Sequence, residues 1–172
     1  MAVFLALHLI PYALNRELIY NVPMYSHTQT GWVTIIGLVA ALLVIGATAT
    51  ELDPDSPGRP FVIASMALFA LLVPLFGSLT VTVDEEAVTA KFGVGLIRKK
   101  IKIKDMRAAA RARNKWYYGW GIRMLDFGWM FNVSGLDAVE IELQGGGRFR
   151  IGTDEPEELE RAIRQRMSLG DK

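Results

Sequence analysis

Residues 31–50 read Gly-Trp-Val-Thr-Ile-Ile-Gly-Leu-Val-Ala-Ala-Leu-Leu-Val-Ile-Gly-Ala-Thr-Ala-Thr. No Asp, Glu, Lys or Arg occurs between Tyr25 and Thr50. A helix needs about 20 mostly apolar residues to cross the ~30 Å hydrocarbon core of a bilayer, and this run supplies them. Tyr25 and Trp32 stand at its start, where aromatic rings favour the membrane interface. We therefore expect a membrane-spanning helix over about residues 31–50.

A second uncharged run begins at Pro60 and ends at Gly77. Its roughly 18 residues are near the lower limit for a helix that crosses a bilayer. Pro60 suits the first position of a helix, and Pro74 is expected to kink the last turn. The alternative is two buried helices of a soluble protein, but such helices normally keep one polar face, and neither run has one. The spans, about 31–50 and 60–77, predict a transmembrane helical hairpin within residues 25–77.

The charges around the two runs indicate the orientation of this hairpin. The connector, residues 51–60, is short, rich in turn residues and acidic. The chain after the second run is strongly basic from Lys91 onward. Because basic segments stay in the cytoplasm, we expect the connector outside and both termini inside. The expected location is the plasma membrane, which is the inner membrane of a bacterium.

The segment before the hairpin, residues 1–24, has two explanations. Residues 1–13 are apolar but short, are interrupted by Pro11 and lack the basic start of a signal peptide. One explanation is an extension that lies in the membrane interface. The other, which we favour, is an over-extended gene start with Met24 as the true initiator.

After Gly77 the period of the apolar residues changes to two, which predicts strands. Apolar and polar residues alternate in segments 79–83, 88–92 and 97–103, and a less regular strand is expected over 106–113. Residues 139–151 contain two alternating runs around three glycines, which predicts a β-hairpin. We expect these strands to form a second domain over residues 78–168, followed by a tail, 169–172.

One amphipathic helix is expected to close this domain. Asp154 is placed to cap it, with Pro156 and Glu157 in its first turn. Its apolar stripe consists of Leu159, Ala162, Ile163 and Met167. The short antiparallel strands and this helix predict an α+β domain. Together with the two spans, they predict a membrane helical hairpin joined to that domain. That domain would be a small antiparallel β-barrel or sandwich capped by its C-terminal helix.

Three segments carry a resemblance to a known family: Trp116-Tyr-Tyr-Gly-Trp-Gly-Ile-Arg123, Asn132-Val-Ser-Gly-Leu-Asp-Ala-Val139 and Phe149-Arg-Ile-Gly-Thr-Asp154. Together with the two spans, they make residues 25–167 similar to the bacterial pleckstrin-homology-like (PH-like) membrane proteins. The resemblance implies a PH-like barrel. It implies little about activity, because one fold hosts many binding roles. Related eukaryotic domains often bind phosphoinositides through a basic first hairpin, where this chain has Asp84-Glu85-Glu86.

A basic run and an aromatic cluster are the candidate binding surfaces. The basic run would hold the domain on anionic headgroups at about 1 kcal/mol per cation, or would only keep the domain in the cytoplasm. The aromatic rings would contact a partner or the bilayer interface, or would pack within the domain. The candidate lipid- or partner-binding residues are Lys99, Lys100, Lys102, Lys104, Arg107, Arg111, Arg113, Lys115, Trp116, Tyr117, Tyr118 and Trp120.

The composition argues against catalysis. The chain has no cysteine, and both histidines, His8 and His27, precede the predicted domain. No acid–base pair or phosphate-binding glycine loop is recognisable, and we expect no cofactor or metal. We expect a non-catalytic membrane protein whose cytoplasmic domain binds a protein partner or another copy of itself. The alternatives are an anionic-lipid-binding module and, second, an enzyme; nucleic acid is not an expected partner.

Overall fold

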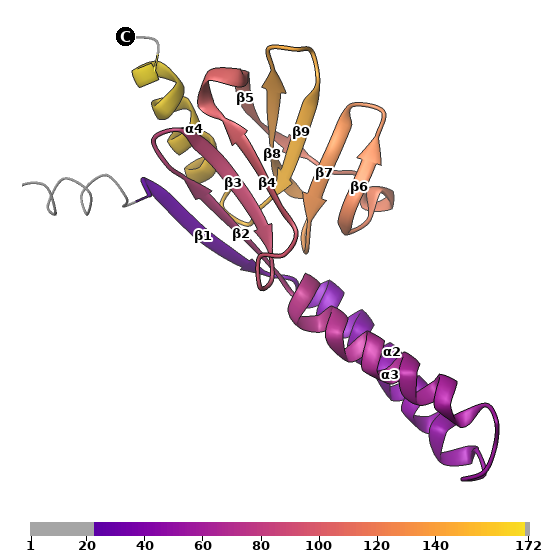
Figure 1. Cartoon of the computed structure of the whole chain (residues 1–172). Helices are drawn as coiled ribbons and strands as arrows, with labels where there is room; N and C mark the ends of the chain where they lie inside the picture. Colours follow the sequence, from indigo (N-terminus) through magenta and orange to yellow (C-terminus); the bar gives the residue numbers. More distant parts are fainter. Residues whose placement is uncertain (1–22, 171–172) are drawn as a thin grey trace, which may run out of the picture.

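The computed structural model describes residues 23–170, in which two long helices project from a β-rich domain (Figure 1). Its elements are β1 (Tyr25–Thr30), α2 (Trp32–Glu51), α3 (Arg59–Phe76), β2 (Ser78–Val83), β3 (Ala87–Phe92), β4 (Arg98–Lys102), η1 (Ile103–Asp105), β5 (Met106–Arg113), η2 (Trp116–Tyr118), β6 (Gly121–Leu125), β7 (Gly128–Asn132), β8 (Asp137–Leu143), β9 (Arg148–Gly152) and α4 (Pro156–Gly170). The expectations for residues 1–22, including an over-extended gene start, lie outside the described residues.

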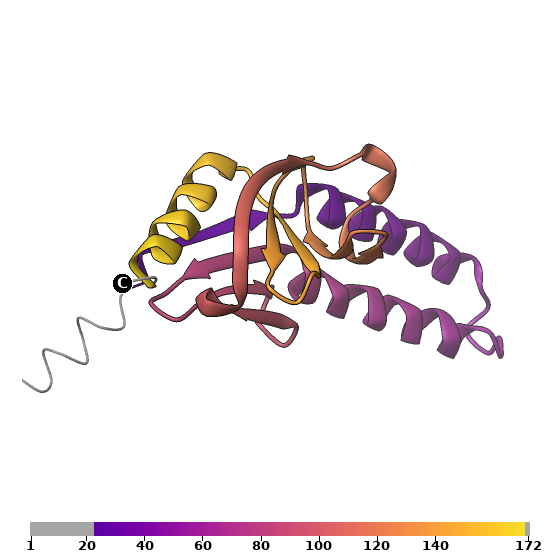
Figure 2. The same cartoon turned by 90° about the horizontal axis from the view of Figure 1, so that it is seen from above.

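The helices α2 and α3 form the expected helical hairpin and lie side by side, as Figure 2 shows; in Figure 1, α3 lies in front of α2. Both are long and apolar enough to cross a membrane, and none of their residues is buried. A core helix of a soluble protein would be mostly buried, and a continuous apolar surface of this size is rare on soluble monomers. The exposure of these helices therefore argues against the soluble alternative.

Strand β1 is the main departure from the sequence-based expectation, which placed residues 25–30 with the hairpin. It pairs antiparallel with β2, from Tyr25 opposite Val83 to Thr30 opposite Ser78. The helical hairpin is thus inserted between two paired strands of one sheet. The β-rich domain therefore consists of residues 24–30 together with 78–170. The expected domain, residues 78–168, lacked the strand that precedes the hairpin.

The strands form two sheets whose apolar faces share one core. The orders are β1-β2-β3-β4 and β5-β8-β9-β7-β6, and every pair is antiparallel except β7 with β9. Phe92 from the first sheet and Ile141 and Ile151 from the second are fully buried in this core. In residues 23–170 no strand pairing joins the two sheets, so of the two expected forms, barrel and sandwich, the closed barrel is not formed. The chain passes from β4 to β5 through η1 without pairing these strands.

Helix α4 has the expected position and buries Leu159 and Ile163 against the core. Its first residue is Pro156, so Glu155 rather than Asp154 precedes the first turn. The Thr153 hydroxyl accepts a hydrogen bond from the Glu155 N–H at 3.1 Å. Asp154 is instead directed to His27, and the predicted Asp154 cap is therefore wrong.

The junction between hairpin and domain is closed by backbone contacts. The Gly31 N–H donates to the Gly77 carbonyl at 2.8 Å, which extends the β1–β2 ladder to the point where α2 begins and α3 ends. The Gly93 N–H donates to the Ser78 carbonyl at 2.9 Å. Gly93 has a φ of +41°, and a Cβ built there would lie 1.9 Å from the Pro74 carbonyl oxygen. The β3–β4 turn therefore packs directly on the backbone of the last turn of α3.

A chain of aromatic contacts continues from this junction into the core. Phe76, the last residue of α3, packs edge-on against Phe92 with ring centroids 5.6 Å apart. Phe92 contacts Phe131 at 5.0 Å, and Phe131 contacts Phe149 at 5.1 Å. Such pairs add about 0.5–1.5 kcal/mol each beyond their burial. The end of the hairpin is thus part of the domain core and not a flexible linker.

We expect Gly93→Ala to lower the free energy of unfolding by about 2–4 kcal/mol, because the new methyl group meets backbone atoms at a positive φ. Thermal unfolding of the purified full-length chain in detergent measures this loss. Gly95→Ala is the matched control: Gly95 also has a positive φ, but its Cβ would meet only the Lys91 side chain at 3.7 Å. This control should lose only about 1–2 kcal/mol, the cost of the left-handed backbone conformation alone. Equal losses in the two variants would contradict the close packing at Gly93.

Candidate binding surfaces

The basic run predicted from the sequence does not form one surface. Strands β4 and β5 run in opposite directions along the domain, so neighbouring cations in the sequence reach opposite ends of it. Lys99 and Lys100 are exposed on the edge strand β4. Arg111 on β5 forms ion pairs with Glu157 and Glu160 of α4. The remaining candidates separate into a distal group, Lys102, Lys104 and Arg107, and a group near the hairpin, Arg113 and Lys115.

The distal group lines a cleft of about 740 Å³. The elements around this cleft lie at the end of the domain away from the hairpin (Figure 1). We call it the distal cleft, and its lining is Glu85, Glu86, Lys102, Ile103, Lys104, Met106, Arg107, Gln144, Met167 and Gly170. It lies between the β2–β3 turn, η1, the start of β5 and the end of α4. Its volume is in the range of ordinary small-ligand or peptide sites.

Three cations of the distal cleft form no ion pair with an acidic side chain of the described residues. Glu85 pairs with Arg166 at 3.3 Å, and Glu86 lies 4.0 Å from the Lys100 ammonium. In the part of the chain that the structure describes, no ion pair involves the cleft's own Lys102, Lys104 or Arg107. The acidic turn is therefore partly neutralised, and the cleft combines free positive charge with apolar side chains.

The aromatic candidates form a segment that we call the aromatic strap, residues 114–120, between β5 and β6. The Asn114 N–H donates to the Leu136 carbonyl at 2.6 Å, and Trp120 Nε1 donates to the Gly135 carbonyl at 3.3 Å. Trp116 is 77% exposed and Tyr117 59% exposed, so neither ring packs in the core. The structure thus favours an exposed aromatic surface over the alternative of core packing for these two rings.

The strap lies near the base of the hairpin. The loop between β7 and β8, which accepts the Trp120 hydrogen bond, also touches the first turn of α2: the Thr34 hydroxyl donates to the Val133 carbonyl at 3.1 Å. Figures 1 and 2 agree in placing the segment between β5 and β6 on the α2 side of the hairpin. Exposed rings are therefore held beside the end of a helix that is long enough to span a bilayer.

Lys115 supplies a positive charge to the strap. Its ammonium lies 5.6 Å from the centre of the Tyr117 ring, within the range of a cation–π contact. The pKa of Lys115 is raised above its ordinary value, mainly by a hydrogen bond with Tyr117. The strap therefore carries a cation at neutral pH next to two exposed rings.

A partly buried ion pair supports the strap from the outer side of the second sheet. Arg150 donates to Glu140 through Nε at 3.1 Å and through a second nitrogen, and both side chains are about 15% exposed or less. Arg150 also donates to the Asn114 side chain at 3.1 Å. Its guanidinium lies 3.9 Å from the centre of the Phe127 ring, which in turn contacts Tyr118.

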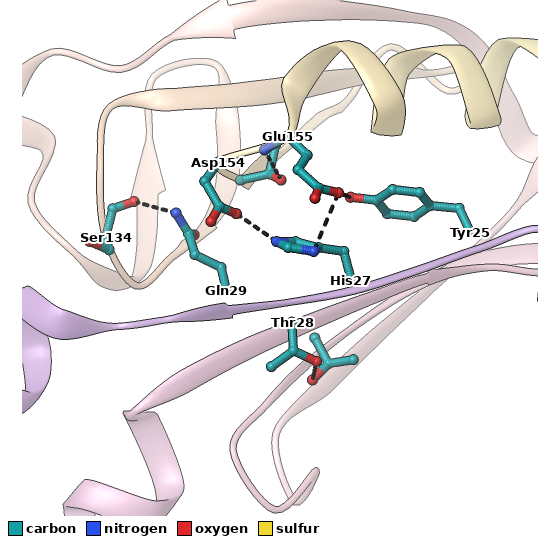
Figure 3. A network of polar contacts seen from close by, with 9 residues as sticks. Tyr25, His27, Thr28, Gln29, Ser134, Asp154 and Glu155 are labelled. Atoms are coloured by element: carbon teal, nitrogen blue, oxygen red, sulfur yellow. Dashed lines mark hydrogen bonds and ion pairs between the residues drawn. The ribbon is translucent and has the colours of Figure 1, made fainter.

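A separate polar cluster connects β1 to the segment before α4 (Figure 3). His27 Nε2 lies 2.7 Å from Asp154 Oδ1, and Nδ1 lies 3.3 Å from Glu155 Oε2. The His27 ring therefore lies between two carboxylates. The Gln29 side chain donates to the Ser134 carbonyl at 3.3 Å. These contacts hold the edge strand β1 in place, and they bring a histidine into the domain that the sequence analysis had placed before it.

Tyr25 completes this cluster. Its hydroxyl donates to Glu155 Oε2 at 3.3 Å. Burial is the main cause that raises the pKa of the Tyr25 phenol; a hydrogen bond with Thr153 opposes this effect, and the charge of Glu155 adds to it. The phenol is therefore protonated at neutral pH and acts as a donor to the carboxylate.

Sequence reasoning missed two groups of exposed or cleft-lining residues. Val94 and Leu96 in the β3–β4 turn are 68% and 79% exposed, and no pattern in the sequence indicated their exposure. Met167 and Gln144 line the distal cleft but are far apart in the sequence. Among residues 23–170, no group of three or more His, Cys, Asp and Glu side chains could hold a metal ion.

We expect Arg150→Met to lower the free energy of unfolding by about 2–4 kcal/mol, because Glu140 and Asn114 would lose a partly buried partner. Arg148→Met is the matched control: Arg148 also reaches Glu140, at 3.4 Å, but its side chain is 48% exposed. That variant should lose less than about 1 kcal/mol. Chemical unfolding followed by tryptophan fluorescence compares the two, and a similar loss in both would refute the support ascribed to Arg150.

Two surfaces, the distal cleft and the aromatic strap, thus remain as candidate sites at opposite ends of the domain. No known protein-family model matches the chain, and no curated protein matches it either. Its function is therefore inferred from the burial, charge and contacts of its own residues.

Proposed function

We propose that this chain is a non-catalytic integral membrane protein whose cytoplasmic domain binds an acidic protein partner at its distal cleft. In this proposal α2 and α3 cross the membrane as a hairpin, with the connector outside. The β-rich domain is of the PH-like kind that the sequence resembles. The observation that carries the binding role is the set of cations in the distal cleft that form no ion pair within the described residues.

The membrane part of the proposal is supported by the exposure and the ends of the helices. Neither helix has a buried residue, and each is long enough to cross the hydrocarbon core. Both helices enter the domain at one end, through Gly31 and Gly77. At the other end, the connector carries Glu51, Asp53 and Asp55 against Arg59. An acidic connector and a basic domain side favour a cytoplasmic domain.

The partner part is supported by the position and chemistry of the distal cleft. The elements that line the cleft lie at the end of the domain opposite the hairpin (Figure 1), where a soluble protein can approach them. Lys102, Lys104 and Arg107 favour carboxylates, while Ile103, Met106 and Met167 offer apolar contact. An acidic segment that also carries an apolar anchor residue fits this combination. Such a segment comes from another protein or from a second copy of this chain.

A second candidate function, an anionic-lipid-binding surface module, is supported by the aromatic strap. Trp116 and Tyr117 are exposed near the base of the hairpin, and Lys115 lies beside them. Tryptophan and tyrosine favour the headgroup region, and a nearby cation adds attraction to anionic lipid. Lipid contact at the strap and partner binding at the distal cleft use different ends of the domain, so the two roles are compatible.

We expect a carbodiimide, which joins lysine amines directly to carboxylates, to crosslink the full-length chain to its partner in native membranes. Lys102→Glu combined with Lys104→Glu should reduce this product by about tenfold or more, because both the positive charge and the reacting amines are lost. Lys99→Glu is the control, since Lys99 is exposed on β4 but does not line the cleft. Immunoblotting and mass spectrometry of the product measure the yield and distinguish a second copy from another protein.

Equal yields from the charge-reversed pair and the Lys99→Glu control would show that the distal cleft is not the contact site. If the unaltered chain gives no product at all, partner binding at the cleft is refuted and the lipid-binding candidate becomes the better explanation.

A further inference from the structure

The β3–β4 turn, residues 93–97, lies at the depth of the last turn of α3. The position of Gly93 shows this: an added Cβ would be 1.9 Å from the Pro74 carbonyl oxygen and 2.8 Å from that of Leu75. Both residues belong to α3, which ends at Phe76. If α3 spans a bilayer, the turn beside its final residues lies within the membrane interface.

The turn presents an apolar tip at this depth. It reads Gly-Val-Gly-Leu-Ile, and it contains no charged or polar side chain. Val94 and Leu96 are 68% and 79% exposed, whereas Ile97 packs against the core. Single exposed apolar residues are ordinary on protein surfaces. Two of them lie on one short turn that packs against α3, an apolar helix without a buried residue. The turn and the helix therefore form a single apolar surface.

Cations flank the apolar tip. Lys91 at the end of β3 stands opposite Arg98 at the start of β4 in the strand register. In the described chain neither residue forms an ion pair. Apolar residues that enter the acyl boundary and cations at the headgroup level are the two elements of interfacial membrane binding.

The aromatic strap supplies a matching contact on the other side of the hairpin. Figures 1 and 2 show the β3–β4 turn beside the base of α3 and the segment between β5 and β6 on the α2 side. Trp116 and Tyr117 are exposed there, with Lys115. The hairpin is therefore flanked by one aliphatic and one aromatic surface, each accompanied by positive charge.

We propose that the β3–β4 turn is a membrane wedge: Val94 and Leu96 insert into the cytoplasmic leaflet beside α3, and Lys91 and Arg98 contact anionic headgroups. The bilayer thus holds the domain at the wedge and at the strap in addition to the hairpin. This inference rests on the proposed membrane-spanning role of α2 and α3. It assigns the turn a lipid surface as its partner and does not depend on what the distal cleft binds.

Depth-dependent quenching of a fluorophore tests the wedge in the full-length chain. The chain has no cysteine, so single cysteines can be labelled without background. An environment-sensitive nitrobenzoxadiazole label is attached at Leu96→Cys, and the protein is reconstituted into bilayers of zwitterionic and anionic phospholipid. Lipids with a nitroxide at a shallow or a deep acyl position are then included as quenchers. We expect strong quenching of the Leu96→Cys label by the shallow quencher and weaker quenching by the deep one.

Two control positions separate the wedge from the hairpin on which it rests. Leu68→Cys lies in the middle of α3 and is 54% exposed, so its label should be quenched best by the deep lipid. Glu158→Cys lies on the exposed side of α4, and its label should not be quenched. An unquenched Leu96→Cys label beside a quenched Leu68→Cys label overturns the wedge and leaves the hairpin intact. If the Leu68→Cys label is not quenched either, the membrane-spanning proposal itself fails.

Discussion

The backbone hydrogen bond from Gly31 to Gly77 closes the β1–β2 ladder where β1 leads into α2 and α3 leads into β2, and the rest of the structure depends on this junction. The paired strands fix the separation and direction of the two helices at their base. The close contact between Gly93 and the Pro74 carbonyl then fixes the β3–β4 turn against α3. Because an antiparallel pair tolerates no register slip without turning its side chains to the other face, this junction leaves little freedom between hairpin and domain.

A rigid junction gives the two ends of the domain different surroundings. The end beside the hairpin carries the β3–β4 turn, with exposed Val94 and Leu96, and the aromatic strap, with exposed Trp116 and Tyr117 beside Lys115. The opposite end carries the distal cleft, with Lys102 and Lys104 among its lining. In the proposed membrane topology, the first end is directed to lipid and the second to the cytoplasm. A domain on a flexible linker could turn either end towards the membrane. The apolar end would then not be kept at the lipid surface.

Local patterns in the sequence predict much of this fold. Uncharged runs of helical length predict α2 and α3, alternation predicts β2 and β3, and the apolar stripe of residues 159–167 predicts α4. Strand β1 could not be predicted in this way, because its six residues are polar and its partner β2 lies beyond both helices. The parallel pairing of β7 with β9 is likewise a product of tertiary structure, since β8 lies between them in the sequence.

The candidate site was harder to predict, because neighbours in sequence are not neighbours in space. The basic run from Lys99 to Lys115 is continuous in sequence, but the reversal between β4 and β5 sends Lys102 and Lys115 to opposite ends of the domain. Arg111 is engaged by acidic residues of α4, which no local pattern indicates. The exposure of Trp116 depends on the path of the strap across the second sheet, and sequence alone leaves it open.

The distribution of distances between a spin label on the hairpin and one on the domain tests the rigid junction most directly. Labels at Val44→Cys on α2 and Glu158→Cys on α4 occupy exposed positions in a chain without native cysteines. Double electron–electron resonance on the full-length chain in lipid nanodiscs should give one narrow distribution, because the junction holds hairpin and domain as one body. A broad distribution, as expected of a domain that swings on a tether, would contradict the account.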